Sequence, residues 1–134
     1  MIVVDASCIL ELLLRSPRSG TRCEKIEARL LSHDGALCAP HLIDVEVSHS
    51  LRRYSLSGEL SAKRGREALT DLADFPLERF SHVELLPRMW QLRDNFTAYD
   101  AAYLALAEAL RAPLMTRDKR LATGRGHHVT IEVF

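Results

Sequence analysis

Short apolar or β-branched runs alternate with helical patterns along the whole chain, and this alternation limits the possible folds more than any other feature. The first run is Ile2-Val3-Val4, and four more strands are predicted at 36–39, 75–80, 114–116 and 129–133. The apolar spacing predicts helices over 7–15, 18–33, 42–55, 61–72, 82–93 and 97–110, and a helical turn over 118–121. Strands separated by helices pair in parallel through crossover connections. We therefore predict an α/β fold with a mostly parallel sheet covered on both faces.

Length and charge narrow the class of protein further. The 134 residues fall within the roughly 100–200 residues of one domain, so we expect a single domain over 1–134. Basic and acidic residues number 18 each, which excludes a uniformly positive binder. No apolar run approaches the roughly 18 residues of a membrane span, and the N-terminus has no signal-peptide pattern. Three cysteines without a CxxC pair fit reduced thiols, so we expect a soluble, cytoplasmic protein.

Two aspartates directly follow predicted strands and are the first candidates for chemistry. Asp5 follows Ile2-Val3-Val4, and Asp118 follows the strand at 114–116 with only Arg117 between. Ligands of open α/β sheets bind beyond the carboxyl ends of the strands, where both acids are expected. Each acid is also in the position of a helix N-cap, which is a purely structural role.

Two further acids lie on predicted helices. Asp100 ends the pattern Thr97-Ala-Tyr-Asp100, which is typical of a capping box and by itself favours a structural role. Glu46 falls on the apolar side of the 42–55 helix, but so does Asp44. Periodicity alone therefore does not choose between these two acids.

If Asp5, Glu46, Asp100 and Asp118 converge, their mutual repulsion requires a cation. A site built only of carboxylate oxygens suits Mg²⁺, with Mn²⁺ as an alternative. The six histidines are scattered or, as in His127-His128, adjacent on a strand, which disfavours a zinc site.

The four acids and their neighbouring residues resemble PIN-domain ribonucleases of the VapC toxin type, from bacterial toxin–antitoxin pairs. The resemblance spans residues 3 to 121, and its third and fourth motifs are the most specific. The matching motifs are Val3-Val4-Asp5-Ala6-Ser7, Pro40…Glu46-Val47, Thr97-Ala98-Tyr99-Asp100-Ala101-Ala102-Tyr103 and Thr116-Arg117-Asp118-Lys119-Arg120-Leu121.

This resemblance implies a fold, a site and partners. The fold is a flavodoxin-like three-layer sandwich around a four- or five-stranded parallel sheet. The site is a Mg²⁺- or Mn²⁺-dependent endoribonuclease centre built by the four acids, with Ser7 and Thr116 as supporting hydroxyls and Asn95 as a weaker supporting candidate. The substrate is RNA, and a VapB-like antitoxin neutralises the enzyme in a hetero-oligomer. A homodimer is also expected, with Ile43, Val47, Leu51 and Tyr54 as exposed apolar surface.

Charge is unevenly distributed despite the neutral total. Basic residues concentrate over 15–29, 52–66 and 111–125, whereas acidic residues concentrate between Glu67 and Glu84. We expect the basic segments to face a polyanion and the acidic stretch to face away from it.

Three other classes of protein are compatible with parts of the pattern. A receiver-like regulatory domain would carry an acidic pair after its first strand, but Asp5 is followed by Ala6. A haloacid-dehalogenase-type phosphatase would carry a second aspartate where Ser7 stands. A PIN-like scaffold that binds RNA or Mg²⁺ without cleavage would be expected to lack one of the acids, and all four are present.

Overall fold

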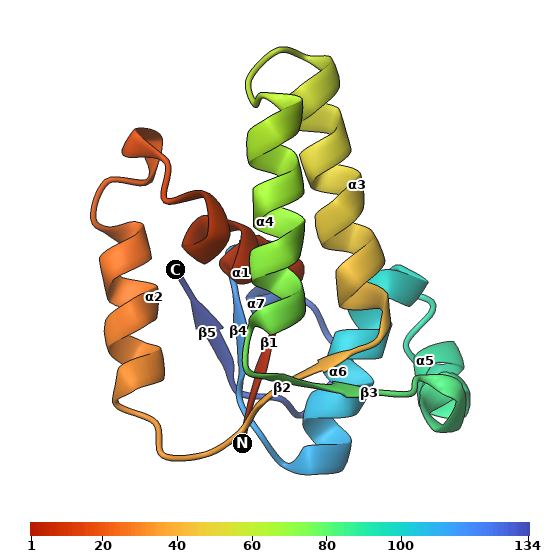
Figure 1. The fold of residues 1–134 in the computed structure, drawn as a ribbon. Helices are drawn as coiled ribbons and strands as arrows, with labels where there is room; N and C mark the ends of the chain where they lie inside the picture. Colours follow the sequence, from red (N-terminus) through yellow and green to blue (C-terminus); the bar gives the residue numbers. More distant parts are fainter.

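The computed structural model describes residues 1–134 and contains one five-stranded sheet in which every neighbouring pair of strands is parallel (Figure 1). The strands are β1 (Ile2–Val4), β2 (Leu37–Pro40), β3 (Leu77–Phe80), β4 (Leu114–Thr116) and β5 (Ile131–Val133). Their order across the sheet is β3-β2-β1-β4-β5. The predicted parallel sheet is confirmed, and it has five strands rather than four.

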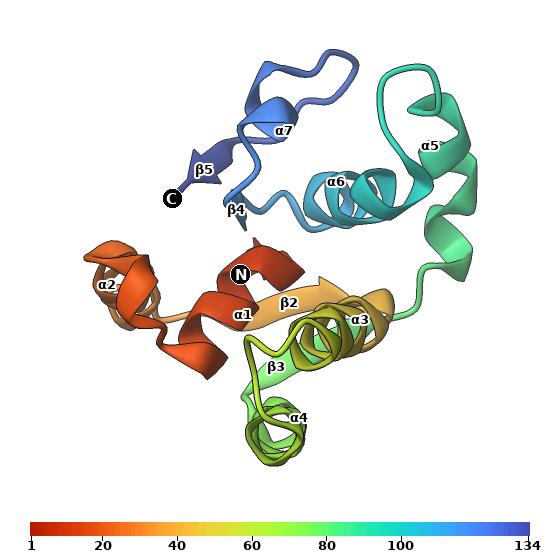
Figure 2. The same ribbon diagram turned by 90° about the horizontal axis from the view of Figure 1, so that it is seen from above.

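Helices cover both sides of this sheet. They are α1 (Ala6–Leu14), α2 (Arg22–Leu31), α3 (Leu42–Leu56), α4 (Ala62–Asp74), α5 (Leu86–Gln91), α6 (Ala98–Leu110) and α7 (Lys119–Thr123), with 3₁₀ turns η1 (Pro17–Ser19) and η2 (Val83–Leu85). Figure 2 shows α2 and α6 on opposite sides of the sheet. Helix α6 packs against β1, β2 and β4, while α1 packs against α2, α3 and α4. The three-layer α/β architecture is therefore confirmed.

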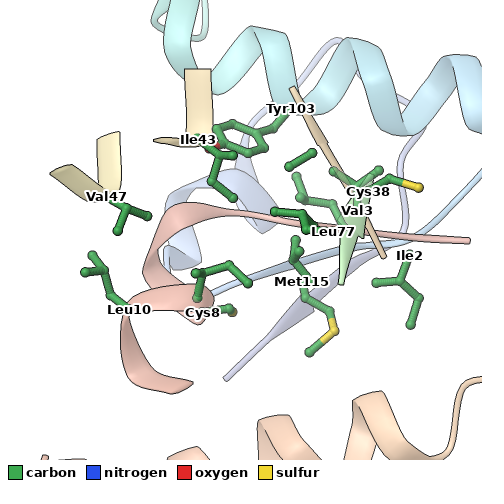
Figure 3. Close-up of a cluster of buried hydrophobic side chains, with 14 of the residues drawn as sticks. Ile2, Val3, Cys8, Leu10, Cys38, Ile43, Val47, Leu77, Tyr103 and Met115 are labelled. Atoms are coloured by element: carbon green, nitrogen blue, oxygen red, sulfur yellow. The ribbon is translucent and has the colours of Figure 1, made fainter. Parts of the chain in front are cut away.

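The core lies at the centre of the sheet. All three residues of β1 are fully buried, as expected for a central parallel strand covered on both faces. Figure 3 shows Val3 among side chains from other strands and helices, including Cys38, Leu77 and Met115. Burial of this apolar cluster fixes the sheet, and with it the positions of the residues that follow each strand.

The strand order places a topological switch point between β1 and β4. The chain runs from β1 outward to β2 and β3, then returns to the other side of β1 to form β4 and β5. In such sheets the crevice beyond the carboxyl ends of the two strands at the switch point is the usual ligand site. The order is not the 2-1-3-4-5 order of flavodoxin and receiver domains, which argues against the receiver-like alternative.

The helix predicted to begin at Arg18 begins instead at Arg22. Gly20 has a φ of +54°, a left-handed conformation that interrupts a helix and that glycine adopts without steric cost. Pro17–Ser19 form the separate turn η1. The helix predicted over 82–93 is likewise divided, into η2 and the shorter α5, with Pro87 in the first turn of α5.

The apolar surface expected on the third helix is a wrong prediction. Ile43, Val47 and Leu51 are buried in the core, because this helix packs against α1 and α4, and only Tyr54 is partly exposed. The exposed apolar residues of α3 are instead Val45 and Leu56. None of the helices is long and apolar enough to span a membrane.

Candidate functional site

One cleft of about 670 Å³ is lined by all four predicted acids. Asp5 follows β1 and Asp118 follows β4, so both lie at the switch point of the sheet. Glu46 reaches the cleft from the second turn of α3, and Asp100 reaches it from the first turn of α6. Segments far apart in sequence thus place four carboxylates around one opening.

Asp5 is both a helix cap and the most buried of the four acids. Its Oδ1 accepts hydrogen bonds from the backbone N–H groups of Ser7 (3.0 Å) and Cys8 (3.3 Å) at the start of α1. The Ser7 hydroxyl also donates to Oδ1, and the Thr116 hydroxyl donates to Oδ2. Burial raises the pKa of Asp5, and these hydrogen bonds oppose the rise. Asp5 thus caps α1 and also lines the cleft.

The two supporting hydroxyls join the ends of β1 and β4. Thr116 is fully buried, and its hydroxyl accepts from the Asp118 backbone N–H at 2.9 Å while it donates to Asp5. The Ser7 hydroxyl accepts from the Arg117 backbone N–H at 3.0 Å. Both predicted supporting residues are thus in contact with Asp5, and they fix the position of the loop that carries Asp118.

Glu46 is held by a tyrosine of the neighbouring layer. The Tyr103 hydroxyl on α6 donates to Glu46 Oε2 at 2.7 Å. Burial raises the pKa of Glu46, the Tyr103 hydrogen bond opposes this, and the charges of Asp5 and Asp100 raise it further. Asp44 forms two hydrogen bonds with the Arg79 guanidinium on β3, at 2.8 and 2.9 Å, and does not line the cleft. Of the two acids between which periodicity does not choose, the structure therefore places only Glu46 in the cleft.

Asp100 and Asp118 have opposite electrostatic surroundings. Burial raises the pKa of Asp100; the Thr97 hydroxyl opposes this, and the charge of Asp118 adds to the rise. The Thr97 hydroxyl also accepts from the Asp100 backbone N–H at 3.2 Å, which is the expected cap of α6. Asp118 caps α7 and binds the Arg120 guanidinium, which lowers the pKa of Asp118.

Asn95 lies outside the cleft. Its side-chain amide donates to the Arg125 carbonyl oxygen at 2.9 Å, which ties the loop before α6 to the loop after α7. The structure thus brings six of the seven predicted site residues together and leaves Asn95 as a loop contact.

Several residues of the cleft were not singled out by sequence reasoning. Tyr103 was noted only as part of a motif, whereas the structure makes it the partner of Glu46. The α3 residues that line the cleft are spaced as one helical face: Val45, Glu46, His49, Ser50, Arg53 and Tyr54. That spacing was readable in the sequence once Glu46 was taken as the reference residue.

The acid set has the chemistry that a hard divalent cation requires. No three His, Cys, Asp or Glu side chains are arranged as a complete set of metal ligands. Yet three carboxylates with raised pKa values share one cleft, two of them raised further by a neighbouring carboxylate, and a divalent cation would relieve that repulsion. His49 also lines the cleft, but the predicted site residues that come together offer only carboxylate and hydroxyl oxygens, which suit Mg²⁺ or Mn²⁺.

A comparison against protein families identifies the family of this chain. The family model of the PIN domain matches residues 2–125. The chain belongs to the PIN domain family.

Within that family, the chain is similar in sequence to ribonucleases named VapC. It is 43% identical over 125 residues to ribonuclease VapC1 of Mycobacterium tuberculosis, covering 92% of this chain and 90% of the relative. It is 34% identical over 133 residues to ribonuclease VapC12 of the same organism, covering 99% of this chain and 98% of the relative.

Solved structures agree in fold. The sarcin–ricin-loop-cleaving toxin VapC20 of Mycobacterium tuberculosis has a TM-score of 0.70 at 13% identity, with 92% of this chain and 94% of that chain covered. VapBC2 of Rickettsia felis, solved with a DNA fragment from its promoter, has a TM-score of 0.68 at 15% identity, with 99% of this chain and 98% of that chain covered.

Proposed function

We propose that this chain is a Mg²⁺- or Mn²⁺-dependent endoribonuclease that acts as the toxin of a toxin–antitoxin pair. One observation carries the proposal: Asp5, Glu46, Asp100 and Asp118, from four separate segments, line one cleft at the switch point of a parallel sheet. Relatives named VapC ribonuclease, at 34–43% identity over most of the chain, support the same activity. The whole chain, 1–134, acts as one nuclease domain.

The four carboxylates would hold the cation. Such an ion supplies Lewis-acid polarisation of the scissile phosphate and neutralises charge on the leaving oxygen. Asp5 is held rigidly by Ser7 and Thr116, and Glu46 is held by Tyr103, so these two acids are pre-positioned.

The proton of the attacking water needs an acceptor, and Asp100 is better suited to this role than Asp5. Both oxygens of Asp5 already accept hydrogen bonds from Ser7, Cys8 or Thr116. Asp100 lines the cleft, and burial raises the pKa of its carboxyl. A raised pKa makes a carboxylate a stronger base near neutral pH, but burial raises the pKa of Asp5 as well, so it is the hydrogen bonds already made by Asp5 that favour Asp100.

A VapB-like antitoxin is the proposed protein partner, in a toxin–antitoxin hetero-oligomer. The likeness in fold to VapBC2 of Rickettsia felis supports this assignment by analogy. A homodimer is also proposed, and its support now comes from the exposed Val83, Leu86 and Trp90 around α5. Three free cysteines are consistent with a cytoplasmic location.

Cleavage of end-labelled RNA by the purified protein tests this function. We expect cleavage with Mg²⁺ or Mn²⁺ and none with EDTA. Glu46→Gln and Asp100→Asn should reduce the rate by at least about a hundredfold, because each removes a charge that the reaction uses. Asp44→Asn is the matched control for Glu46 because it lies on the same helix outside the cleft, and Asp94→Asn, an exposed acid outside the cleft, is the control for Asp100.

The outcomes separate the two candidate functions. Loss of activity in the cleft variants alone supports the nuclease. If all variants cleave equally, the activity comes from a contaminant and the proposal fails. If the protein binds RNA and never cleaves it with either metal, the alternative of a non-cleaving PIN-like scaffold replaces it.

A further inference from the structure

A second cavity, of about 640 Å³, opens beside the four-acid cleft. It is lined by the end of α1, by η1, by the start of α2 and by residues of α3 and α4. Leu10, Tyr54 and Arg117 line both cavities, so the two are adjacent and share part of their walls. Figure 1 shows α1 between α2 and α4, and all three helices contribute residues to the lining of the second cavity.

The second cavity is rich in arginine. Its basic residues are Arg18, Arg22, Arg64 and Arg117, against the acids Glu11 and Glu59, and only 4 of its 13 lining residues are apolar. These arginines come from the three basic segments that the sequence showed, which the fold therefore brings to one place. The planar guanidinium of arginine matches the geometry of phosphate oxygens. A cavity of this composition is therefore better suited to bind a nucleic-acid backbone than the apolar face of a helix.

A buried carboxylate holds two of these arginines. Glu11 is only 8% exposed, and its Oε1 binds Arg117 Nη1 at 2.6 Å and Arg22 Nη1 at 3.2 Å. Its Oε2 is buried and has no hydrogen-bond partner. One negative charge is thus shared by two guanidinium groups, which leaves net positive charge in the lining of the second cavity.

Arg117 connects the two cavities. Its backbone N–H binds the Ser7 hydroxyl, which in turn binds Asp5, while its side chain binds Glu11. The position of Arg117 relative to the acids is therefore fixed at both its main chain and its side chain. A strand whose scissile phosphate lies at the acids would meet Arg117 next on leaving the cleft toward the second cavity.

We propose that the arginine-lined cavity binds the phosphate backbone of the single-stranded RNA segment next to the scissile bond, with buried Glu11 orienting Arg22 and Arg117. This inference rests on the proposed nuclease function, because it uses the acidic cleft to place the scissile phosphate. Glu11 is a positioning residue here and does not itself contact the RNA, since its free oxygen is buried.

Binding of a short fluorescein-labelled single-stranded RNA, measured by anisotropy in EDTA at several salt concentrations, tests the proposal. The test variants are Arg18→Ala and the double variant Arg18→Ala with Arg22→Ala. Arg18 has no side-chain hydrogen bond or ion pair, so its removal does not disturb the fold. Arg66→Ala is the control, because Arg66 is exposed on α4, outside both cavities and equally unpaired.

We expect the double variant to bind about tenfold more weakly, with a salt dependence of log K less steep by roughly 1.4, about 0.7 for each lost phosphate contact. Arg18→Ala should show about half of this change in slope, and Arg66→Ala should match the unsubstituted protein. If both test variants bind like Arg66→Ala, the inference is wrong. If they bind RNA normally but escape neutralisation by the co-expressed antitoxin, the cavity is a protein-binding site and the inference is also wrong.

The role of Glu11 has its own readout. Loss of a negative charge alone would strengthen RNA binding, whereas loss of an orienting group would weaken it. We therefore expect Glu11→Gln to weaken binding, and stronger binding would exclude the positioning role.

The experiments distinguish a failure of this inference from a failure of the proposed nuclease function. If the unsubstituted protein cleaves RNA with Mg²⁺ while the arginine variants bind normally, only the inference fails. If binding depends on Arg18 and Arg22 but no cleavage occurs with either metal, the nuclease function fails and the cavity remains an RNA-binding site.

Discussion

Tyr103 on α6 donates its hydroxyl to Glu46 Oε2 on α3 across 2.7 Å and so links helices from two layers of the fold. The Tyr103 ring is buried beside Ile43, as Figure 3 shows, so the hydroxyl has little freedom to move. A carboxylate that must bind a cation gains a fixed orientation from such a partner.

Tyr103→Phe should therefore weaken the binding of the cation that cleavage requires, without unfolding the protein. Loss of an orienting partner of a metal ligand typically costs about 10–100-fold in metal affinity or activity. We expect the Mg²⁺ concentration for half-maximal cleavage to rise by about this factor. Tyr99→Phe is the control, since Tyr99 lines the same cleft but is exposed and makes no hydrogen bond through its hydroxyl. An unchanged Mg²⁺ requirement in Tyr103→Phe would show that Glu46 needs no support.

Without metal, the stability of the protein should fall as the pH rises above about 5, where normal carboxyl groups are already ionised. Burial raises the folded-state pKa values of Asp5, Glu46 and Asp100, so above their unfolded pKa values the native state binds more protons than the unfolded state. Their stabilising contribution is complete below the unfolded pKa values and is lost as the pH passes the raised ones. The lowered pKa values of Asp118 and Glu108 act only at more acidic pH.

Asp5→Asn isolates this effect. Asparagine also caps helices, so α1 keeps its cap while the buried charge disappears. The Tm of this variant in EDTA should match that of the unsubstituted protein near pH 4 and exceed it by a few degrees at neutral pH. Mg²⁺ should raise the Tm of the unsubstituted protein more than that of the variant, because ligand binding stabilises by mass action. A gap in Tm that does not change with pH would contradict the assignment of the raised pKa.

Thr116 should be needed for its hydroxyl rather than for its shape. Thr116→Val preserves the volume at this fully buried position but removes the contacts with Asp5 and with the Asp118 backbone N–H. The unpaired groups should cost about 1–3 kcal/mol of unfolding free energy, measured by urea denaturation. Cleavage should fall in parallel, because the Asp118 loop loses its anchor. Thr116→Ser keeps the hydroxyl and should recover most of the activity, and equal activity in both variants would exclude this role.

The layered fold was predictable because strand and helix periods are local signals. Asp5, Thr97 and Asp118 were predicted as helix caps, and each is one. The acids Asp5, Asp100 and Asp118 were also predictable as a group, since parallel topology brings strand ends and helix starts to one edge.

Long-range partners were not predictable. Asp44 and Glu46 have similar helical surroundings, and what separates them is Arg79 on β3 for one and Tyr103 on α6 for the other. Glu11 was overlooked inside the apolar run Ile9–Leu14, although a single acid in such a run indicates a buried charge with distant partners. Those partners, Arg22 and Arg117, become visible only when the chain is folded.

The contact between Arg120 and Asp118 gives a prediction about metal affinity. The Arg120 guanidinium binds the Asp118 carboxylate, although the Arg120 side chain itself is 86% exposed. A cation bound at Asp118 must compete with this guanidinium for the same oxygens. Arg120→Ala should therefore bind Mn²⁺ more tightly in the absence of RNA, by less than about tenfold because exposed ion pairs are weak.

Isothermal titration of Mn²⁺ into the RNA-free protein measures this effect. Arg125→Ala is the matched control, because it removes the same charge from a nearby exposed residue whose side chain contacts no acid. A gain in both variants would indicate a general change of electrostatic potential, whereas a gain in Arg120→Ala alone requires direct competition at Asp118. If Arg120→Ala binds Mn²⁺ no more tightly than the unsubstituted protein, Asp118 does not serve as a ligand in the RNA-free state.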